Sequence, residues 1–216
     1  MERIVSGVGV LDKSMAVLDA LAAAGAEGLA LGEVVARTAI PKPTAHRLLI
    51  AVEAHGLVRR RADGRWVLGG RLVELGRRAS AAWPVAEVAR PVLERLRDDS
   101  GESVQLYVRD GDERVCLVSL ESRHELRTIV AEGARLPLAA GSAGRLLRGE
   151  PVDGSWVASV EERAPGVASV SAPVLVGGAV VAAVGISGPV ERLGRHPGDD
   201  HGPAVTAAAE RIGTAL

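Results

Sequence analysis

Residues 30–68 are the part of the sequence that most constrains the fold. They predict a helix over 31–38, a tight turn at 39–41, a second helix over 42–54 and a hairpin with Asp63-Gly64 at its tip. An Asp-Gly pair between two strand-like runs is a strong signal for a β-hairpin. Helix, tight turn, helix and two-stranded wing is the layout that places one helix in the major groove of DNA. The sequence therefore predicts a winged helix-turn-helix, with double-stranded DNA as its partner.

Positive charge is concentrated in the same part of the chain. Residues 1–79 carry 12 basic and 8 acidic side chains, a sum of +4, whereas residues 80–216 sum to −5. The whole chain has a formal charge of −1. A cationic segment on a nearly neutral protein favours contact with phosphates. A solvated Arg-rich surface is the alternative, but the position of the charges on the second helix and the wing favours DNA.

The helix over 42–54 divides into an apolar face and a polar face. Its apolar residues recur at helical spacing and predict the buried side: Ala45, Leu48, Leu49 and Val52. The first turn and the other face are then available to DNA, and the positive end of the helix dipole favours a phosphate there. Arg47 has the forked donors that suit a guanine edge, whereas His46 is more often a general polar contact. The residues expected to contact DNA from this helix are Lys42, Pro43, Thr44, His46 and Arg47.

The wing over 57–68 supplies the other expected DNA contacts, which are Arg59, Arg60, Arg61 and Arg65. Val58, Trp66 and Leu68 are expected to pack inward. Arg59, Arg61 and Arg65 would then be free to reach the DNA backbone or the minor groove. Taken alone, the wing is as well explained as an ordinary charged hairpin.

The remaining sequence predicts an α+β architecture with a curved antiparallel sheet and a pocket. A first helix over 12–24 has an apolar face of Met15, Leu18, Leu21 and Ala22, and the helix over 85–99 has one of Val88, Pro91, Val92 and Leu96. A last helix is expected over 203–215. Strands are expected over 104–108, 114–120, 126–131, 167–176 and 179–187. We divide the chain into a DNA-binding domain (1–68), a linker helix (69–82) and a second domain (83–216).

Composition places the chain among globular proteins of a reducing compartment. A hydrophobic content of 47% is ample for a packed core. The single cysteine, Cys116, excludes an intramolecular disulfide. The sequence shows no signal peptide and no long uninterrupted apolar run, so we expect a cytoplasmic protein without a membrane partner.

We expect neither an enzyme nor a protein that holds a cofactor or a metal. The sequence contains no P-loop, no His-Glu-x-x-His and no Gly-x-Ser-x-Gly motif. Cys116 lies in an apolar strand pattern, which favours a packing role. The metal-capable groups near the C-terminus fall where Gly198 and Gly202 predict a flexible loop; they are His196, Asp199, Asp200 and His201.

Three stretches resemble the isocitrate lyase regulator family, the IclR-type transcriptional regulators. They are PKPTAHRLLIAVEAHGLVRR at 41–60, GDERVCLVSLES at 111–122 and PGVASVSAPVLVGGAVVAAVGISGP at 165–189. Shorter motifs, including GESVQLY, AAGSAGRLL and SGPVERLGRHPG, resemble the actinobacterial subgroup that controls leucine and other amino-acid biosynthesis. The resemblance implies a winged helix joined to a GAF-like effector-binding domain. It also implies dimers that pair through the N-terminal domain and often assemble into tetramers.

The resemblance further implies an effector between the helix after the Leu-Pro-Leu motif and the last hairpin. The matching residues of this chain are Gly141, Ser142, Ala143, Ser169 and Ser187. Free amides at a helix start and hydroxyls on facing strands suit a small carboxylate such as an amino acid or keto acid. Leu138, Val170 and Val184 predict room for an aliphatic side chain, so leucine or a precursor is our first expectation. The alternative is that these small residues only let helix and strands pack closely.

Two positions depart from the pattern of that family. Ser159 stands where many relatives have an acidic residue before the pair Glu161-Glu162. Residues 148–155 form a short connection where the family usually has one or two further helices. This connection is either a natural deletion or a gap in the sequence itself. A deletion would leave the pocket partly open to water, and we then expect weak effector binding.

Together these features predict a homo-oligomeric, effector-responsive regulator that binds a palindromic operator as a dimer or tetramer. We expect the dimer to pair through the first helix and the linker helix, which exposes Leu72, Val73 and Leu75. The alternative from another class is a small-molecule sensor whose winged helix serves as a protein-interaction module.

Overall fold

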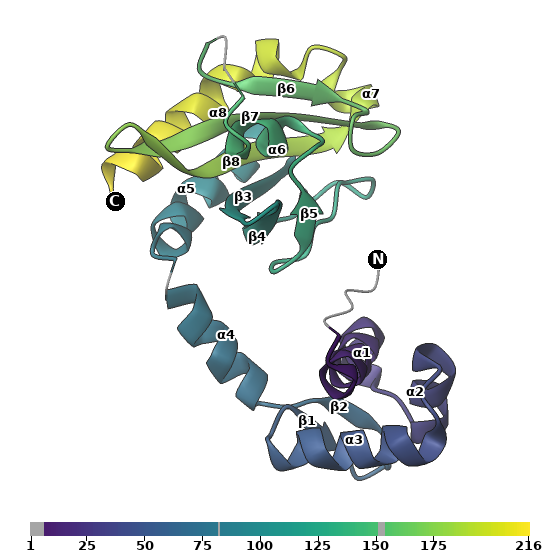
Figure 1. Cartoon of the computed structure of the whole chain (residues 1–216). Coiled ribbons are helices and arrows are strands. Elements are labelled where there is room, and N and C mark those ends of the chain that lie inside the picture. The colour runs from purple at the N-terminus through teal and green to yellow at the C-terminus, as the bar shows by residue number, and fades with distance from the viewer. Residues whose placement is uncertain (1–6, 82, 151–153) are drawn as a thin grey trace. The chain divides into compact units, whose positions relative to one another are not determined.

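The chain divides into two compact units, 1–81 and 82–216, in the computed structural model (Figure 1). The structure describes residues 7–81, 83–150 and 154–216. The linker helix predicted over 69–82 belongs to the first unit as α4, Arg71–Ala81. Residues 1–6 of the first predicted domain, residue 82 of the predicted linker and 151–153 of the short connection lie outside the described residues.

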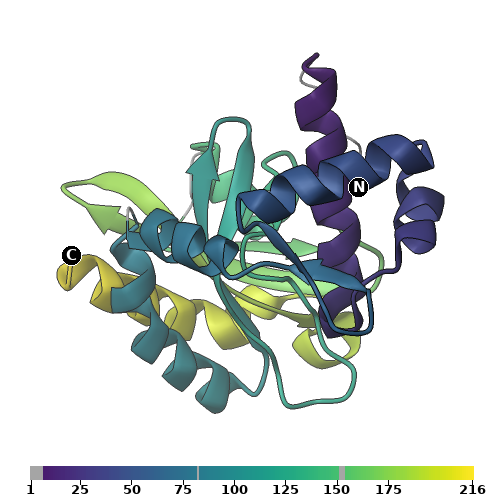
Figure 2. The ribbon, with the colours of Figure 1, turned by 90° about the horizontal axis from the view of Figure 1, so that it is seen from below.

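The first unit combines helices with a short hairpin. Its elements are α1 (Gly9–Ala24), a 3-10 turn (Gly25–Glu27), α2 (Leu31–Thr38), α3 (Lys42–Ala54), β1 (Val58–Arg60), β2 (Trp66–Leu68) and α4. α2 and α3 have the predicted bounds, and α1 begins three residues before the predicted start at residue 12. β1 and β2 pair antiparallel around the Asp63-Gly64 turn. Figure 2 shows α3 crossing α1, and the predicted winged helix-turn-helix is present.

One hydrophobic core holds the first unit together. The predicted inner face of α3 is buried in it, beside Val17 and Leu21 of α1 and Trp66 of the wing. Trp66 also pairs with Leu29 through two backbone hydrogen bonds of 2.8 and 2.9 Å, which fix the wing to the chain before α2. Three predicted inward residues are instead exposed, namely Met15, Ala22 and Leu68. On α1, Val17 is buried in place of Met15 because it lies one turn before Leu21, on the same face of the helix. On β2, the close approach of the chain at Gly28 covers Val67, which is buried in place of Leu68.

The second unit is a six-stranded antiparallel sheet with helices on both faces (Figure 1). Its helices are α5 (Val85–Ser100), α6 (Ser142–Leu147), α7 (Val190–Leu193) and α8 (Pro197–Thr214). Its strands are β3 (Ser103–Asp110), β4 (Glu113–Leu120), β5 (Arg135–Pro137), β6 (Val157–Val160), β7 (Val167–Val176) and β8 (Ala179–Pro189). The sheet order is β5-β4-β3-β8-β7-β6. The predicted α+β class with a curved antiparallel sheet is confirmed.

The two faces of this sheet have different chemistry. Val104, Leu106 and Val108 of β3 belong to the main core, which α5 and α8 cover. Gln105 and Tyr107, the alternate residues, point to the other face, where α6 lies. β7 and β8 alternate in the same way. Polar side chains therefore gather between the sheet and α6.

Several predicted elements of the second unit are wrong. Residues 126–131 form no strand; the Thr128 carbonyl instead accepts a hydrogen bond of 2.7 Å from the Ser103 hydroxyl. β6 escapes prediction because it is only four residues long. The buried face of α5 is the i, i+4 series of Val85, Ala89 and Leu93 with Leu96, and the predicted Pro91 is exposed.

The segment expected to be a flexible loop before residue 203 forms the first turns of α8. Its two glycines lie one turn apart and face the indole ring of Trp156. A Cβ atom would lie 2.0 Å from that ring at Gly198 and 2.3 Å from it at Gly202. These glycines therefore serve close packing of a helix against an aromatic ring and do not provide flexibility.

No helix in the described part of the chain is both long enough and apolar enough to cross a membrane.

Adding a single methyl group at Gly198 is expected to destabilise the second unit. Gly198→Ala should lower the free energy of unfolding by about 1–3 kcal/mol, the usual cost of overpacking a core. Chemical denaturation measures the change. In a Trp156→Ala background the same substitution should be neutral or slightly stabilising, because alanine is the better helix former. An equal loss in both backgrounds would show that Trp156 is not the cause.

Candidate nucleic-acid interface and ligand pocket

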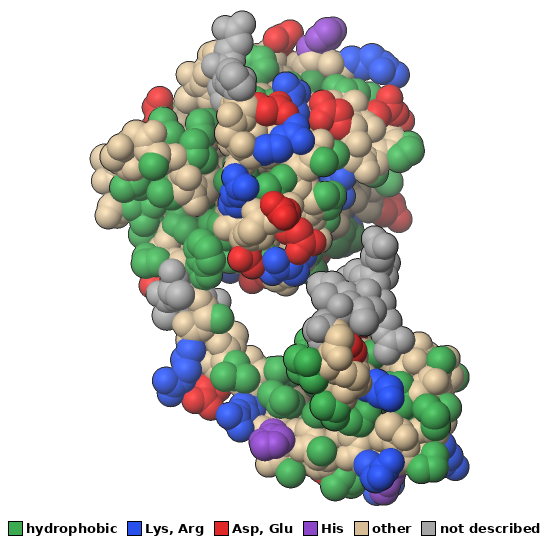
Figure 3. All heavy atoms as spheres, in the orientation of Figure 1, with side chains coloured by type: hydrophobic (Ala, Val, Ile, Leu, Met, Phe, Trp, Pro, Cys, Tyr) green, Lys and Arg blue, Asp and Glu red, His purple; other side chains and the backbone are tan. Residues whose placement is uncertain are grey.

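The outer face of α3 presents unpartnered polar side chains to solvent. Lys42, Pro43, His46 and Arg47 are exposed, and Thr44 is half-buried. Within the described residues, no hydrogen bond or ion pair involves the side chains of Lys42, His46 and Arg47. Figure 3 shows basic and histidine side chains along the edge of this unit that α3 forms. This face has donors and positive charge available for another molecule.

The start of α3 is also open. Pro41 occupies the N-cap position, no side chain caps the helix, and its first turn contains no acidic residue. The Thr44 amide donates to the Pro41 carbonyl at 2.9 Å and Pro43 has no amide hydrogen, so the positive end of the helix dipole is the main attraction at this helix start. Such a start favours an anion, and phosphate groups are the usual one.

Arg65 of the wing differs from its expected conformation. Its Nε donates to the Glu27 carbonyl and its Nη2 to the Gly28 carbonyl, each at 3.0 Å. The same Nη2 lies 2.8 Å from the carboxylate of Glu33. The Ala30 amide, first, and then Arg65 lower the pKa of Glu33. Arg65 is thus tied to the chain before α2, and the expectation that it is free to reach DNA is wrong for this conformation.

The other wing arginines are only partly free. Arg61 donates to the Ala26 carbonyl at 3.0 Å and pairs with Asp63 at 3.2 Å, so the same correction applies to it. Arg60 lies over the Trp66 ring and donates to the Gly64 carbonyl at 3.2 Å. Arg59 is exposed and makes no side-chain hydrogen bond or ion pair within the described residues. The carbonyl groups of the turn before α2 compete with DNA for the arginines of the wing.

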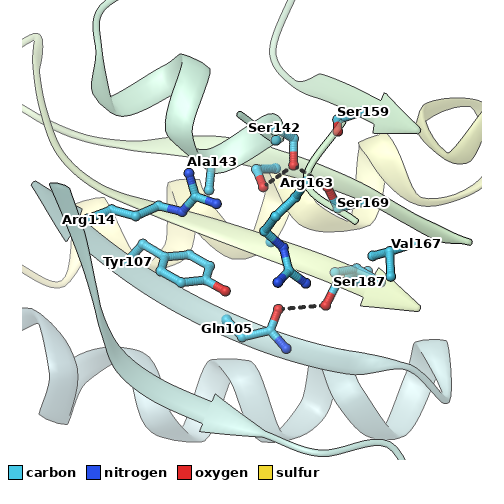
Figure 4. Close-up of a pocket in the computed structure, with 14 residues that line it drawn as sticks. Gln105, Tyr107, Arg114, Ser142, Ala143, Ser159, Arg163, Val167, Ser169 and Ser187 are labelled. Atoms are coloured by element: carbon cyan, nitrogen blue, oxygen red, sulfur yellow. Dashed lines mark hydrogen bonds between the residues drawn. The ribbon is translucent and has the colours of Figure 1, made fainter. Parts of the chain in front are cut away.

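The second unit contains a cavity between α6 and the polar face of the sheet (Figure 4). All five residues expected to bind an effector line it: Gly141, Ser142, Ala143, Ser169 and Ser187. Six further polar side chains of the lining were not predicted: Gln105, Tyr107, Arg114, Ser159, Arg163 and Ser171. The cavity has a volume of about 30 Å³. A larger ligand therefore requires side chains of the wall to move.

Hydroxyl groups form two separate sets of contacts in this cavity. The Ser142 hydroxyl lies 2.8 Å from the hydroxyls of both Ser169 and Ser171. The Ser187 hydroxyl donates to Oε1 of Gln105 at 2.9 Å. Polar contacts thus join α6 to β7 and, separately, β8 to β3.

The start of α6 differs from the expected anion site. Its Gly141 amide already donates to Oε2 of Glu162 at 3.1 Å. α6 has only six residues, so its dipole is small. The Gly141 amide is therefore already used by a carboxylate of the chain, and that carboxylate is not part of the cavity lining.

The aliphatic surroundings expected around the effector are also wrong. Val170 and Val184 belong to the main core on the opposite face of the sheet. The reason is strand alternation, because Val170 follows Ser169 directly and must point the other way. Leu138 packs in a separate cluster with α6.

Two arginines approach the cavity instead. Arg114 is buried, its Nη1 donates to the carbonyls of Pro137 and Ala140 at 2.6 and 2.8 Å, and its guanidinium lies over the Tyr107 ring. Arg163 comes from the turn between β6 and β7 and points into the cavity (Figure 4). The sequence signal for Arg114 is a basic residue directly before the apolar run of residues 115–118 in β4. We find no comparable signal for Arg163.

Neither a reactive cysteine nor a metal centre is evident. Burial raises the pKa of the Cys116 thiol to about 12, so the group stays protonated near neutral pH. The described residues contain no group of three His, Cys, Asp or Glu side chains that would hold a metal ion.

Comparison with known proteins identifies both units. A family model described as the IclR helix-turn-helix domain matches residues 10–62, and one described as the bacterial transcriptional regulator IclR C-terminal matches residues 78–149. Together the two models cover more than half of the chain. The second match ends at residue 149, near the start of the short connection over 148–155.

Individual relatives are regulators and not enzymes. The transcriptional regulator KipR of Bacillus subtilis is 35% identical over 54% of this chain and 47% of its own length. This chain thus spans about half the length of that relative. Two solved structures share the fold, each covering 96% of this chain and 98% of the other. They are the Thermotoga maritima IclR (TM-score 0.77, 20% identity) and an IclR homolog from Microbacterium hydrocarbonoxydans complexed with 4-hydroxybenzoate (0.76, 24%).

The contacts of Arg65 predict a structural effect of its removal. Arg65→Ala should lower the free energy of unfolding of the first unit by about 1–2 kcal/mol, since hydrogen bonds from a charged group are lost at a partly exposed site. Arg59→Ala, which removes an exposed and unpartnered arginine from the same hairpin, is the matched control and should change little. Urea unfolding followed by circular dichroism compares the two. Equal stabilities would contradict the anchoring role of Arg65.

Proposed function

Because this chain belongs to the IclR family of transcriptional regulators, we propose that it binds operator DNA and senses a small carboxylate metabolite in the cytoplasm. The observation that carries the DNA-binding half is the outer face of α3. There Lys42, His46 and Arg47 are exposed, without partners among the described residues, beside an uncapped helix start. The opposite face of the same helix is buried, so this surface is the one a major groove can meet.

Roles for individual residues follow from their donors. Arg47 would read a guanine through two parallel hydrogen bonds, while Lys42 and Thr44 would contact phosphate or base edges. Pro43 and His46 complete the surface at the first turn. Arg59 would contact the DNA backbone directly. Arg60, Arg61 and Arg65 would add positive potential and hold the wing in place.

Exposed apolar side chains support a homodimer. Val73 and Leu75 of α4 are 59% and 44% exposed, and Val10, Leu11 and Met15 of α1 are exposed as well. Large apolar side chains exposed on two helices of a small unit favour an interaction surface. We propose that two copies pair through α1 and α4, and that the dimer reads the two halves of a palindromic operator. Pairs of dimers would give the tetramer.

The cavity of the second unit supports the effector half of the proposal. Its five expected residues lie together, and hydrogen-bond donors dominate its wall. The homolog from Microbacterium hydrocarbonoxydans is complexed with 4-hydroxybenzoate, which is itself a small carboxylate. The polar lining favours an oxygen-rich ligand over the aliphatic side chain of leucine. Control of leucine or other amino-acid biosynthesis genes rests on the motif resemblance alone, and we keep it as our proposal for the target.

Substitutions on α3 and on the wing should affect DNA binding differently. Arg47→Ala should weaken binding to the specific operator by about 1–3 kcal/mol, the value of a good bidentate base contact. Arg59→Ala should weaken binding to all sequences evenly and reduce the salt slope by about 1, as the loss of a phosphate contact does. Gel shifts on selected genomic fragments at several salt concentrations test both. Unchanged operator affinity in Arg47→Ala would show that α3 does not read the bases.

A charge within the proposed dimer surface should separate the subunits. Leu75→Glu is expected to give monomers that bind half-sites poorly, because the glutamate would lose its water in the interface. Leu126→Glu, at an exposed leucine of the second unit, is the control and should leave the dimer intact. Sedimentation at micromolar concentration distinguishes them. A monomeric wild-type chain would rule out the proposed pairing.

A further inference from the structure

We propose that the cavity between α6 and the sheet binds a dicarboxylate, with one carboxylate held by Arg114 and the other by Arg163. The inference rests on the proposed effector-sensing function and specifies the class of its ligand. Three observations carry it: a buried arginine without an acidic partner, a buried amide without an acceptor, and a second arginine whose neighbouring carboxylates are engaged elsewhere.

Arg114 is a buried charge that the chain does not neutralise. Its residue is 3% exposed, and no carboxylate forms an ion pair with it within the described residues. Two carbonyls and the Tyr107 ring satisfy part of the guanidinium, but its buried Nε has no hydrogen-bond partner. Burying an unpaired charge is costly, and such groups are found where a ligand supplies the missing partner.

The position of Arg114 is built into the packing of α6. A Cβ atom at Gly144 would lie 2.2 Å from Nη1 of Arg114 and 2.6 Å from the Leu138 carbonyl. Glycine at this helical position therefore lets α6 approach the guanidinium. Arg114 is held rigidly at the inner end of the cavity, which lowers the entropic cost of binding an anion there.

Gln105 provides a second unfilled donor. It is 1% exposed, and its Oε1 accepts the hydrogen bond from Ser187. Its Nε2 has no partner. Because the acceptor of this amide is used and its donor is not, the group missing from the cavity is an acceptor.

Arg163 brings a second positive charge into the cavity. Figure 4 shows its side chain directed from the β6–β7 turn toward Gln105 and Ser187. The two glutamates before it are engaged elsewhere: Glu161 accepts from the Gly166 amide at 3.0 Å and lies 3.6 Å from Arg195, and Glu162 accepts from the Gly141 amide. Arg163 itself makes no hydrogen bond or ion pair with the described residues.

The two charges act on the same space. Burial, which is the largest effect, and the charge of Arg163 both lower the pKa of Arg114, while Tyr107 opposes them. No aspartate or glutamate is among the residues that line the cavity. Two guanidinium groups therefore face a space without carboxylates, and a ligand with two negative charges would balance them. Two carboxylates also match the forked geometry of the two guanidinium groups.

The narrow free space assigns different roles to the two arginines. Arg114 is fixed, whereas Arg163 projects from a turn and fills part of the cavity. A dicarboxylate would displace the Arg163 side chain from the interior and then pair with it at the mouth. Ligand binding would thereby link β4 to the β6–β7 turn.

Isothermal titration of the full chain with malonate, succinate, glutarate and adipate, each beside its monomethyl ester, tests the proposal. Methylation removes one charge and leaves the rest of the ligand nearly unchanged. We expect the best diacid to bind at least about tenfold more tightly than its ester, the ratio that one charge-assisted hydrogen bond provides. In Arg163→Gln this preference should disappear, with diacid and ester binding equally.

Arg123→Gln is the matched control. This exposed arginine of the same unit lies outside the cavity, so its loss should leave the preference unchanged. Equal binding of diacid and ester by the wild type, or a preference that survives Arg163→Gln, would overturn the dicarboxylate assignment while leaving a carboxylate sensor. Binding of none of these ligands would overturn it as well, and operator affinity measured in parallel reports separately on the DNA-binding half.

Discussion

Side chains of a strand alternate between the two faces of a sheet, and the second unit depends on this constraint for both its core and its cavity. Along β3, β7 and β8, one set of residues builds the apolar face under α5 and α8. The intervening residues supply Gln105, Ser169 and Ser187 to the other face. Because each strand contributes to both, a polar cavity directly adjoins a dry core. A shift in register by one residue would exchange the two and abolish both.

Arginine has three different roles in this chain, and its partners decide which. Arg65 donates hydrogen bonds to carbonyl groups of its own unit and stabilises the wing. Arg47 has no partner in the described chain and faces solvent, so its donors are available to DNA. Arg114 is buried and forms no ion pair with the described residues, and in our proposal a ligand supplies the opposite charge. Residue type alone does not separate these cases, because the difference lies in contacts with residues distant in the sequence.

Sequence reasoning succeeded where the signals are local and failed where the partner is remote. α2 and α3 have the expected bounds because a turn, a proline and a short apolar period define them within a few residues. The first turns of α8 were missed because Gly198 indicates flexibility until Trp156 is known to lie against it. The five residues expected around an effector do line one cavity, yet Arg163 is not foreseen, because only the fold brings the β6–β7 turn close to α6. The hydrogen bond from the Gly141 amide to Glu162 also depends on the fold bringing this turn close to α6.

The contact between Trp156 and the two glycines of α8 has a consequence for sequence change in related chains. An indole that lies flat on a helix leaves no room for a side chain at either glycine. A larger residue on the helix is compatible only with a smaller ring at 156, and a tryptophan there requires both glycines. The residues at these three positions should therefore covary, so that related chains keep or lose this packing contact as a unit.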